Sequence, residues 1–346
     1  GLSAATGYYC QSANISPEGW CSDIVISSQF TTDAGGSAAT GRFVCPDGND
    51  SNDGTSYAQR WATFTNATGL PTGTDLWSCP DVTWTNTRFE PDWDGTSGDP
   101  VLIGTHVGTT SPLQWSPSDT EAMAILDYTA GLTGNPDWVY RPRADYTQIT
   151  SLDLRADDNT PGSGRPAMIY VGSDANNTFI GPYTKIQAWD SEAQAIAAYS
   201  TNKVDGIRLN STTNVTIDNI ELRWTFQGII GDDATQVNVL NSEIYEYVRN
   251  GVHIYANNSP SSAWNGEWIV QGNRIHDSYD SDGIQIDSSG RTDGIHGLMR
   301  RVAIRNNHLW GFGEQAIDIK GAQYVLVEGN LVRRSIGAND GPVVGG

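Results

Sequence analysis

Short runs of alternating apolar and polar residues recur five times between residues 204 and 334. The first run of each repeat places an aliphatic residue, or in one case Gly, at its second and fourth positions. The starts of these runs lie 22, 23, 32 and 33 residues apart, a period typical of one turn of a solenoid. The five runs are Gly206-Ile207-Arg208-Leu209, Gly228-Ile229-Ile230-Gly231, Gly251-Val252-His253-Ile254, Gly283-Ile284-Gln285-Ile286 and Ala316-Ile317-Asp318-Ile319.

Two further apolar runs complete each repeat. Their alternation with period two predicts half-buried strands, and the i, i+3, i+4, i+7 spacing of an α-solenoid is absent. An Asn at a bend tolerates the left-handed conformation and bonds to backbone, so we expect the Asn residues before the third runs to stack as a ladder. The second runs are Val215–Ile217, Val237–Val239, Trp268–Val270, Val302–Ile304 and Val325–Val327, and the third runs follow Asn219, Asn241, Asn273, Asn307 and Asn330.

The front half of the chain points to the same architecture. Residues 41–44, 73–79 and 100–103 are predicted strands, and a long polar turn occupies 45–55. Between residues 105 and 203 we expect coils interrupted by long loops, and we interpret Asp190–Tyr199 as a short helix or an insertion. The order of strand, Asp-Gly-Asn-Asp turn, Trp61-Ala62-Thr63-Phe64 and strand resembles the opening of secreted right-handed parallel β-helix proteins that act on carbohydrates.

The fold class is therefore expected to be all-β, a right-handed parallel β-helix with a short amino-terminal extension. We predict that residues 1–40 form this extension and pack on the helix, and that 41–346 form the helix itself. The chain begins at Gly1 without Met, which we interpret as a mature or trimmed chain. We expect a monomer.

The composition of the chain limits the classes of partner that it is expected to bind. The 346 residues carry a formal net charge of −20, and only 17% of them are charged, as suits a turn-rich β protein. So acidic a surface repels nucleic acid and anionic membranes, which we therefore exclude as partners. No apolar run approaches the length that spans a membrane.

The four Cys residues indicate an exported protein. Cys45 and Cys79 follow equivalent strands and are predicted to stack within bridging distance, whereas Cys10 and Cys21 would close a short loop. The alternative is free buried thiols. Zinc is not expected, because paired Cys or His spacings are absent.

Strand alternation also predicts which residues face outward from the first runs. Because neighbouring strands lie about 4.8 Å apart, outward residues of successive coils should form two columns. Ionisable groups gather on the last three coils, and each of them could also be an ordinary surface residue. The first column is Arg208, Ile230, His253, Gln285 and Asp318, and the second is Asn210, Asp232, Tyr255, Asp287 and Lys320, with Asp277, Asp280, Asp282 and Glu314 at the rim.

The preferred hypothesis is a lyase that cleaves an acidic polysaccharide by β-elimination. Lys320 is the candidate base, a role that needs a lowered pKa, and His253 or Tyr255 are alternative proton carriers. The Asp cluster resembles that of calcium-dependent pectate lyases, which implies Ca²⁺ held by Asp277, Asp280, Asp282 and Asp287. The chain departs from that pattern, since Gln285 replaces an Asp and Asp318 occupies the Lys column. The candidate substrate-binding residues are Arg208, Gln285, Arg305, Trp264 and Trp310.

Two alternatives remain open. The phrases at Asp282-Gly283-Ile284 and Glu314-Gln315-Ala316-Ile317-Asp318 are similar to polygalacturonase motifs, which implies a glycoside hydrolase with Asp282 and Glu314 as paired carboxylates and Asp318 beside them. The Gly-His-Gly and Arg-Ile-Lys motifs that should follow in a polygalacturonase are missing from this chain. The other alternative is a non-catalytic carbohydrate-binding wall or spike, in which exposed Trp rings such as Trp224 and Trp268 stack on sugars.

Overall fold

The computed structural model describes residues 41–107, 113–114, 122–128, 138–156, 166–198, 203–256, 265–287, 299–320 and 322–333. The chain divides into two compact units, Gly1–Thr40 and Gly41–Gly346. Residues 1–40, with Cys10 and Cys21, lie outside the described part. The predicted packing of that extension on the helix therefore stays a prediction.

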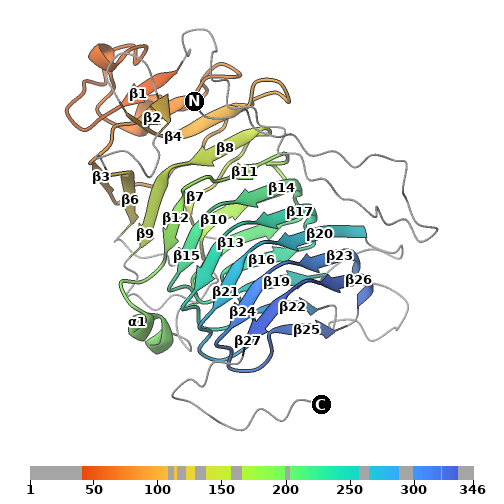
Figure 1. Ribbon diagram of the computed structural model, residues 1–346. Coiled ribbons are helices and arrows are strands. Elements are labelled where there is room, and N and C mark those ends of the chain that lie inside the picture. The colour runs from red at the N-terminus through yellow and green to blue at the C-terminus, as the bar shows by residue number, and fades with distance from the viewer. Residues whose placement is uncertain are drawn as a thin grey trace. The chain divides into compact units, whose positions relative to one another are not determined.

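Three parallel sheets wind along the described chain as a right-handed β-helix (Figure 1). From β4 onward each complete coil contributes one strand to each sheet, and the strands of successive coils are hydrogen-bonded neighbours. The predicted fold is confirmed. Sheet I is formed by β7 (Trp138–Tyr140), β10 (Ala167–Val171), β13 (Asp205–Asn210), β16 (Ile229–Asp232), β19 (Val252–Tyr255), β22 (Ile284–Asp287) and β25 (Ile317–Lys320).

Sheets II and III carry the second and third runs of each repeat. Sheet II is β1 (Arg42–Val44), β2 (Leu76–Ser78), β4 (Val101–Val107), β8 (Thr147–Thr150), β11 (Phe179–Ile180), β14 (Thr213–Asp218), β17 (Thr235–Leu240), β20 (Asn265–Gln271), β23 (Met299–Arg305) and β26 (Ala322–Glu328), with β5 (Leu113–Gln114) antiparallel to β4. Sheet III is β3 (Thr83–Thr85), β6 (Ala124–Tyr128), β9 (Leu152–Ala156), β12 (Lys185–Gln187), β15 (Glu221–Arg223), β18 (Glu243–Tyr245), β21 (Arg274–His276), β24 (His308–Trp310) and β27 (Leu331–Arg333).

Helical structure is sparse in the described residues. The helix α1 (Glu192–Ala197) lies within the segment interpreted as a short helix or an insertion, and the Ser191 side chain accepts a hydrogen bond from the Gln194 N–H at its N-terminus. Two 3₁₀ turns, η2 (Tyr57–Gln59) and η3 (Phe64–Asn66), follow the polar turn after β1.

The interior of the helix is a continuous apolar core built from the inward positions of every coil. In sheet I, Ile207, Ile229, Val252 and Ile284 all have 0% exposure. One coil departs from the pattern at Gly231, where an added Cβ would lie 2.2 Å from the Trp268 ring. The Trp268 ring fills the space that other coils give to an aliphatic side chain.

Trp268 is therefore a core residue, which corrects its prediction as an exposed sugar platform. Its side chain has 0% exposure, and its Nε1 donates to the Ala234 carbonyl at 2.9 Å. A buried indole N–H needs such a partner.

The predicted Asn ladder exists, but the five Asn residues assigned to it fall at two neighbouring positions of the bend. The ladder occupies one of these two columns. Asn273 Nδ2 donates to Asn307 Oδ1 at 3.0 Å, and Asn307 Nδ2 donates to Asn330 Oδ1 at 2.9 Å. Asn219 and Asn241, which we assigned to the same column, stand one position earlier. Their φ angles of 54° and 45° place them in a left-handed column, because that bend requires positive φ.

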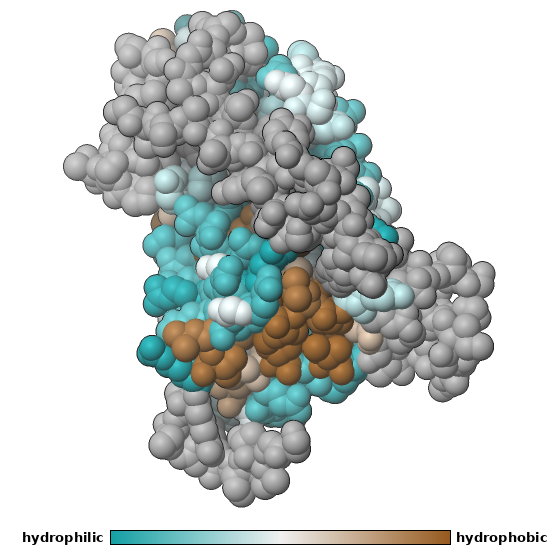
Figure 2. All heavy atoms as spheres, turned by 45° about the vertical axis from the view of Figure 1, so that its right-hand side comes forward, coloured by the Kyte–Doolittle hydropathy of each residue, from teal (hydrophilic) through white to brown (hydrophobic). Residues whose placement is uncertain are grey.

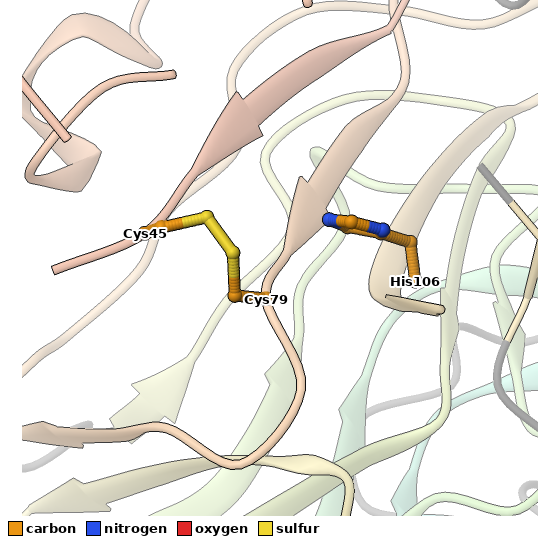
Figure 3. A group of neighbouring side chains, drawn as sticks. All are labelled: Cys45, Cys79 and His106. Atoms are coloured by element: carbon orange, nitrogen blue, oxygen red, sulfur yellow. A yellow bond between two sulfur atoms is a disulfide. The ribbon is translucent and has the colours of Figure 1, made fainter. Parts of the chain in front are cut away.

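The first two coils are joined by the predicted Cys45–Cys79 disulfide, whose Cα atoms are 5.3 Å apart (Figure 3). Val44 and Ser78, the residues just before these Cys, are paired in register. Stacked coils thus bring together two Cys that are 34 residues apart in the chain.

Candidate active site

The two predicted columns exist on the outer side of sheet I, and we call them together the strip. The pairing runs Arg208, Ile230, His253, Gln285, Asp318 in the first column. In the second column it runs Asn210, Asp232, Tyr255, Asp287, Lys320. Side-chain alternation therefore predicted both columns at single-residue accuracy.

The two columns differ in accessibility, which the sequence did not predict. In the first column His253, Gln285 and Asp318 are buried, with exposures of 8%, 4% and 8%. In the second column Tyr255 and Asp287 are half-buried, and the Lys320 side chain is 47% exposed. The second column is therefore the more accessible of the two, and the buried first column lies beside it on the same side of sheet I.

A chain of hydrogen bonds across three coils leads to Lys320. Asn250 Nδ2 donates to Gln285 Oε1 at 2.9 Å, and Gln285 Nε2 donates to Asp318 Oδ2 at 3.3 Å. Asp318 Oδ2 in turn forms an ion pair with Lys320 Nζ. Asn250 and Gln285 are buried, so this relay fixes the Asp318 carboxylate and, through it, the ammonium group.

The surroundings of Lys320 keep its amine protonated. The hydrogen bond with Asp318 is the main cause that raises the pKa of Lys320, and the charges of Asp318, Asp282 and Asp287 add to it. A base needs the opposite shift. In this environment Lys320 is an ammonium group at neutral pH, and it can accept a proton only after losing its own under alkaline conditions.

Asp282 also has a raised pKa, but because it is a carboxyl group it is neutral when it holds its proton. Burial is the main cause, and the negative charges of Asp318 and Glu314 add to it, so the pKa of Asp282 rises to about 6. Oδ1 accepts a hydrogen bond from the Gln315 N–H at 3.0 Å, which opposes the shift. Asp282 has 0% exposure, so its carboxyl group has no direct access to solvent.

The alternative proton carriers, His253 and Tyr255, occupy neighbouring positions in the two columns. The ring of His253 lies 5.6 Å from that of Tyr255, and His253 Nδ1 is 3.0 Å from Gln227 Nε2. Burial raises the pKa of Tyr255, and the charges of Asp287, Asp232 and Asp233 raise it further. Tyr255 therefore keeps its proton at neutral pH.

Arg208 lies at the other end of the strip. Its guanidinium nitrogens are 3.6 Å from Asp205 Oδ2 and 3.8 Å from Asp232 Oδ2. Four strand steps of about 4.8 Å separate Arg208 from Asp318. Arg208 therefore cannot touch the same sugar unit as Lys320, and its role in substrate binding stays a prediction.

Other predicted site residues lie elsewhere. Arg305 belongs to sheet II, where it lies 3.8 Å from Glu328, and Trp310 belongs to sheet III. Asp280 and Glu314 are exposed in the bends that precede β22 and β25. Trp264 is outside the described residues.

The four predicted calcium ligands do not converge. Asp277 Oδ2 is 2.8 Å from His276 Nδ1, at the end of the sheet III strand β21, whereas Asp282 accepts bonds from the Gln315 N–H and the Ser281 hydroxyl. Asp280 and Asp287 do not bring their oxygens to a common point with these two. This set does not fit the dense oxygen shell that Ca²⁺ needs, so calcium itself stays a prediction.

Within the described ranges, one group of three side chains brings potential metal ligand atoms within 4.8 Å of one another: Cys45, Cys79 and His106. Figure 3 shows that the two sulfur atoms are joined. Disulfide sulfurs are not thiolate ligands, so we assign this group to structure. The buried His106 ring packs edge-on against Phe43 at 5.0 Å.

Sheet III carries an outward column of which the sequence analysis named only Trp310. The ring of His276 stacks between those of Tyr245 and Trp310, with centroid distances of 5.2 and 4.0 Å. One face of Trp310 is thus covered by His276. The same alternation rule that predicted the strip, applied to the third runs, would have found these three residues.

Comparison with known proteins supports the fold. No family model matches the chain, and no curated protein matches it. Among solved structures, the chain is similar to pectate lyase Pel9A, with 12% sequence identity, a TM-score of 0.53, and coverage of 90% of this chain and 82% of that one. It is also similar to a rhamnogalacturonan lyase, with 10% identity, a TM-score of 0.52, and coverage of 88% and 90%.

These similarities confirm the parallel β-helix that the repeats predicted. At such low identity they describe the arrangement of the backbone, and function has to be argued from the side chains of the strip. None of the helices in the described segments combines the length and the apolar character needed to span a bilayer.

Proposed function

We propose that the protein is a secreted polysaccharide-degrading enzyme that binds a glycan along the second column of the strip and reacts at Lys320. The observation that carries this proposal is the buried relay from Asn250 through Gln285 to Asp318. An ordinary surface ion pair is not held in place by a buried hydrogen-bond relay of this kind. The disulfide supports export, and the two similar structures are named as a pectate lyase and a rhamnogalacturonan lyase.

The first candidate reaction is β-elimination from a uronate-containing glycan. Deprotonated Lys320 would remove the proton at C5, the C4–C5 double bond would form, and the C4–oxygen bond would break, with the leaving sugar oxygen taking a proton from water. The carboxylates around Lys320 hold its proton. We therefore expect lyase activity to rise with pH into the alkaline range and to follow the titration of this amine.

The test compares two lysines in similar surroundings. Lys320 and Lys185 have side chains that are 47% and 48% exposed, and each pairs with a carboxylate, Asp318 or Glu221. Lys185 belongs to sheet III. We expect Lys320→Ala to lower kcat by about 10²- to 10⁴-fold, the usual contribution of a general base, and Lys185→Ala to leave it unchanged.

Activity would be measured on a panel of acidic and neutral glycans, with both unsaturated and reducing ends quantified. Unsaturated product from the native chain and none from Lys320→Ala supports elimination with Lys320 as base. Full turnover in Lys320→Ala would remove this residue from the mechanism. Unaltered activity in excess chelator would exclude calcium from the proposed mechanism.

Hydrolysis is the second candidate, and the raised pKa of Asp282 favours it. A carboxyl group with a pKa of about 6 beside Asp318 and Glu314 has the electrostatics of a general acid. Its lack of exposure argues against direct proton transfer to a glycan, so we rank hydrolysis second. Here activity should fall as pH rises above about 6, and the products should carry reducing ends without unsaturation.

A further inference from the structure

Sheet III carries a second surface that is rich in aromatic and cationic side chains. In one outward column of this sheet, Arg274 of β21 is the register partner of His308 of β24. In the other column, His276 is the partner of Trp310, and Trp310 is the partner of Arg333 in β27. We call these residues together the sheet III patch. It shares no residue with the strip, which belongs to sheet I.

The neighbours of Trp310 fix the orientation of its indole ring. The ring stacks on that of His276 with a centroid distance of 4.0 Å and an interplanar angle of 8°, and the His308 ring lies 4.3 Å away. His276 is itself held by two carboxylates, because Nε2 is 3.2 Å from Glu243 and Nδ1 is 2.8 Å from Asp277. A half-buried ring that is fixed in this way loses little freedom when a ligand packs against it.

The charges that act on His308 are positive, although the whole chain has a net charge of −20. Burial is the main cause that lowers the pKa of His308. The positive charges of three neighbours, Arg333, Arg274 and His276, lower it further. The Arg274 side chain is 60% exposed, and its Nη2 is 3.0 Å from Glu243 Oε1. Arg333 is also exposed, and no carboxylate of the described ranges forms an ion pair with it. Two guanidinium groups therefore have donors available to an anion.

Hydrophobic surface adjoins these charges. Figure 2 shows hydrophobic residues gathered at the lower end of the described coils, where Figure 1 places β27. Leu331 of β27 is 47% exposed and is the register partner of His308. The patch thus offers an aromatic ring and guanidinium groups beside an exposed aliphatic side chain.

A sugar that carries a carboxylate matches this combination. Guanidinium groups bind carboxylates in planar, charge-assisted pairs. The C–H faces of a sugar ring are apolar and pack on indole and aliphatic side chains. Single-stranded nucleic acid also combines anionic groups with rings that stack, but its row of phosphates would meet the strongly acidic remainder of the chain.

We propose that the sheet III patch binds a uronate unit of an acidic glycan, as a second site separate from the strip. Arg274 and Arg333 bind the carboxylate, and the apolar face of the sugar packs on Trp310. Binding at the patch does not involve Lys320. The further role of holding a polysaccharide on the protein, while another part of that polysaccharide reacts at the strip, rests on the proposed function.

Histidine ring signals in nuclear magnetic resonance spectra report on the two sites separately. His276 and His308 belong to the patch, and His253 belongs to the strip. The acidic probe is trigalacturonate and the neutral probe is maltotriose, both added to the full chain with Lys320→Ala so that the acidic probe is not consumed. We expect trigalacturonate to shift the His276 and His308 signals, with an apparent affinity that falls as salt rises, and maltotriose to leave them unchanged.

Substitutions in the patch should weaken this binding. Arg274→Gln and Arg333→Gln should each lower the apparent affinity about tenfold, because each removes charge-assisted hydrogen bonds to the carboxylate. Trp310→Ala should cause a similar loss, whereas Trp310→Phe keeps a ring and should retain most of the affinity. The matched control is Arg143→Gln, since the Arg143 side chain is 51% exposed and also pairs with a carboxylate. It should leave the affinity unchanged.

Three results would overturn the proposal. The first is an equal response to the acidic and the neutral probe, or unchanged affinity in the patch variants. The second is a shift confined to His253, which would refute the patch and leave the proposed function intact. The third is tighter binding of a single-stranded oligonucleotide than of trigalacturonate at His276 and His308. Conversely, the expected shifts in a chain that turns over no glycan would support the patch and refute the proposed function.

Discussion

Asp282 should destabilise the folded protein at neutral pH, and Asp282→Asn should relieve that cost. The pKa of Asp282 rises from 3.8 to about 6 on folding, mainly because of burial. Each pKa unit corresponds to about 1.4 kcal/mol, so ionisation of this buried group costs about 3 kcal/mol well above pH 6.

The direction of the pH effect on stability follows from the difference in proton binding between the folded and unfolded chains. Because the folded pKa is the higher one, the unfolded chain loses this proton first as pH rises from about 4 to 6, and stability falls over that interval. Asn has no proton to lose. Its Oδ1 can still accept from the Gln315 N–H, and its Nδ2 can donate to the Ser281 hydroxyl, which now donates to Asp282 Oδ2 at 3.2 Å.

Denaturant unfolding of both chains at pH 4 and pH 8 measures the effect. We expect Asp282→Asn to be more stable by about 2–3 kcal/mol at pH 8 and by less than about 1 kcal/mol at pH 4. The control is Asp280→Asn, an exposed Asp two positions earlier, which should show no such pH-dependent gain. An equal effect of Asp282→Asn at both pH values, or a loss of stability at pH 8, would refute the reasoning.

Three further changes test the scaffold. Trp268→Ala should cost about 3–5 kcal/mol of unfolding free energy, because it empties the space beside Gly231. Calorimetry would measure this loss, and an unchanged thermal transition would contradict the assignment of Trp268 to the core. Replacing Cys45 and Cys79 by Ser should cost about 4 kcal/mol by the loop-entropy argument for a 34-residue separation, with reduction of the native chain as the parallel test. Asn307→Ala should cost about 1–3 kcal/mol by leaving the ladder groups of its neighbours unpaired, whereas exposed Asn49→Ala should not reproduce this loss.

The strands and the strip were predictable because both depend on period-two alternation and on the spacing of repeats. Each strand carries its own inward and outward pattern, so the partners of His253 and Lys320 follow from alignment of the runs. The left-handed column was missed because Asn serves in both columns: Asn241 occupies the bend and Asn273 the ladder.

Accessibility and convergence were not predictable from the same pattern. Alternation assigns a side of the sheet, but it does not say whether that side meets solvent, and so the burial of Gln285 was unexpected. The carboxylates of Asp277 and Asp282 lie on either side of a bend, and the direction of each depends on turn geometry that composition does not encode.

The position of Lys320 has a consequence for heat inactivation. In the described chain, β25 is hydrogen-bonded to β22 along one edge. Each unit of a solenoid is held only by its neighbours, so local unfolding can separate one coil from the next. Separation of β25 from β22 would carry Lys320 away from Tyr255 and His253, so loss of activity on warming should precede melting of the remaining coils, and enzyme assays and circular dichroism would give two separate midpoints.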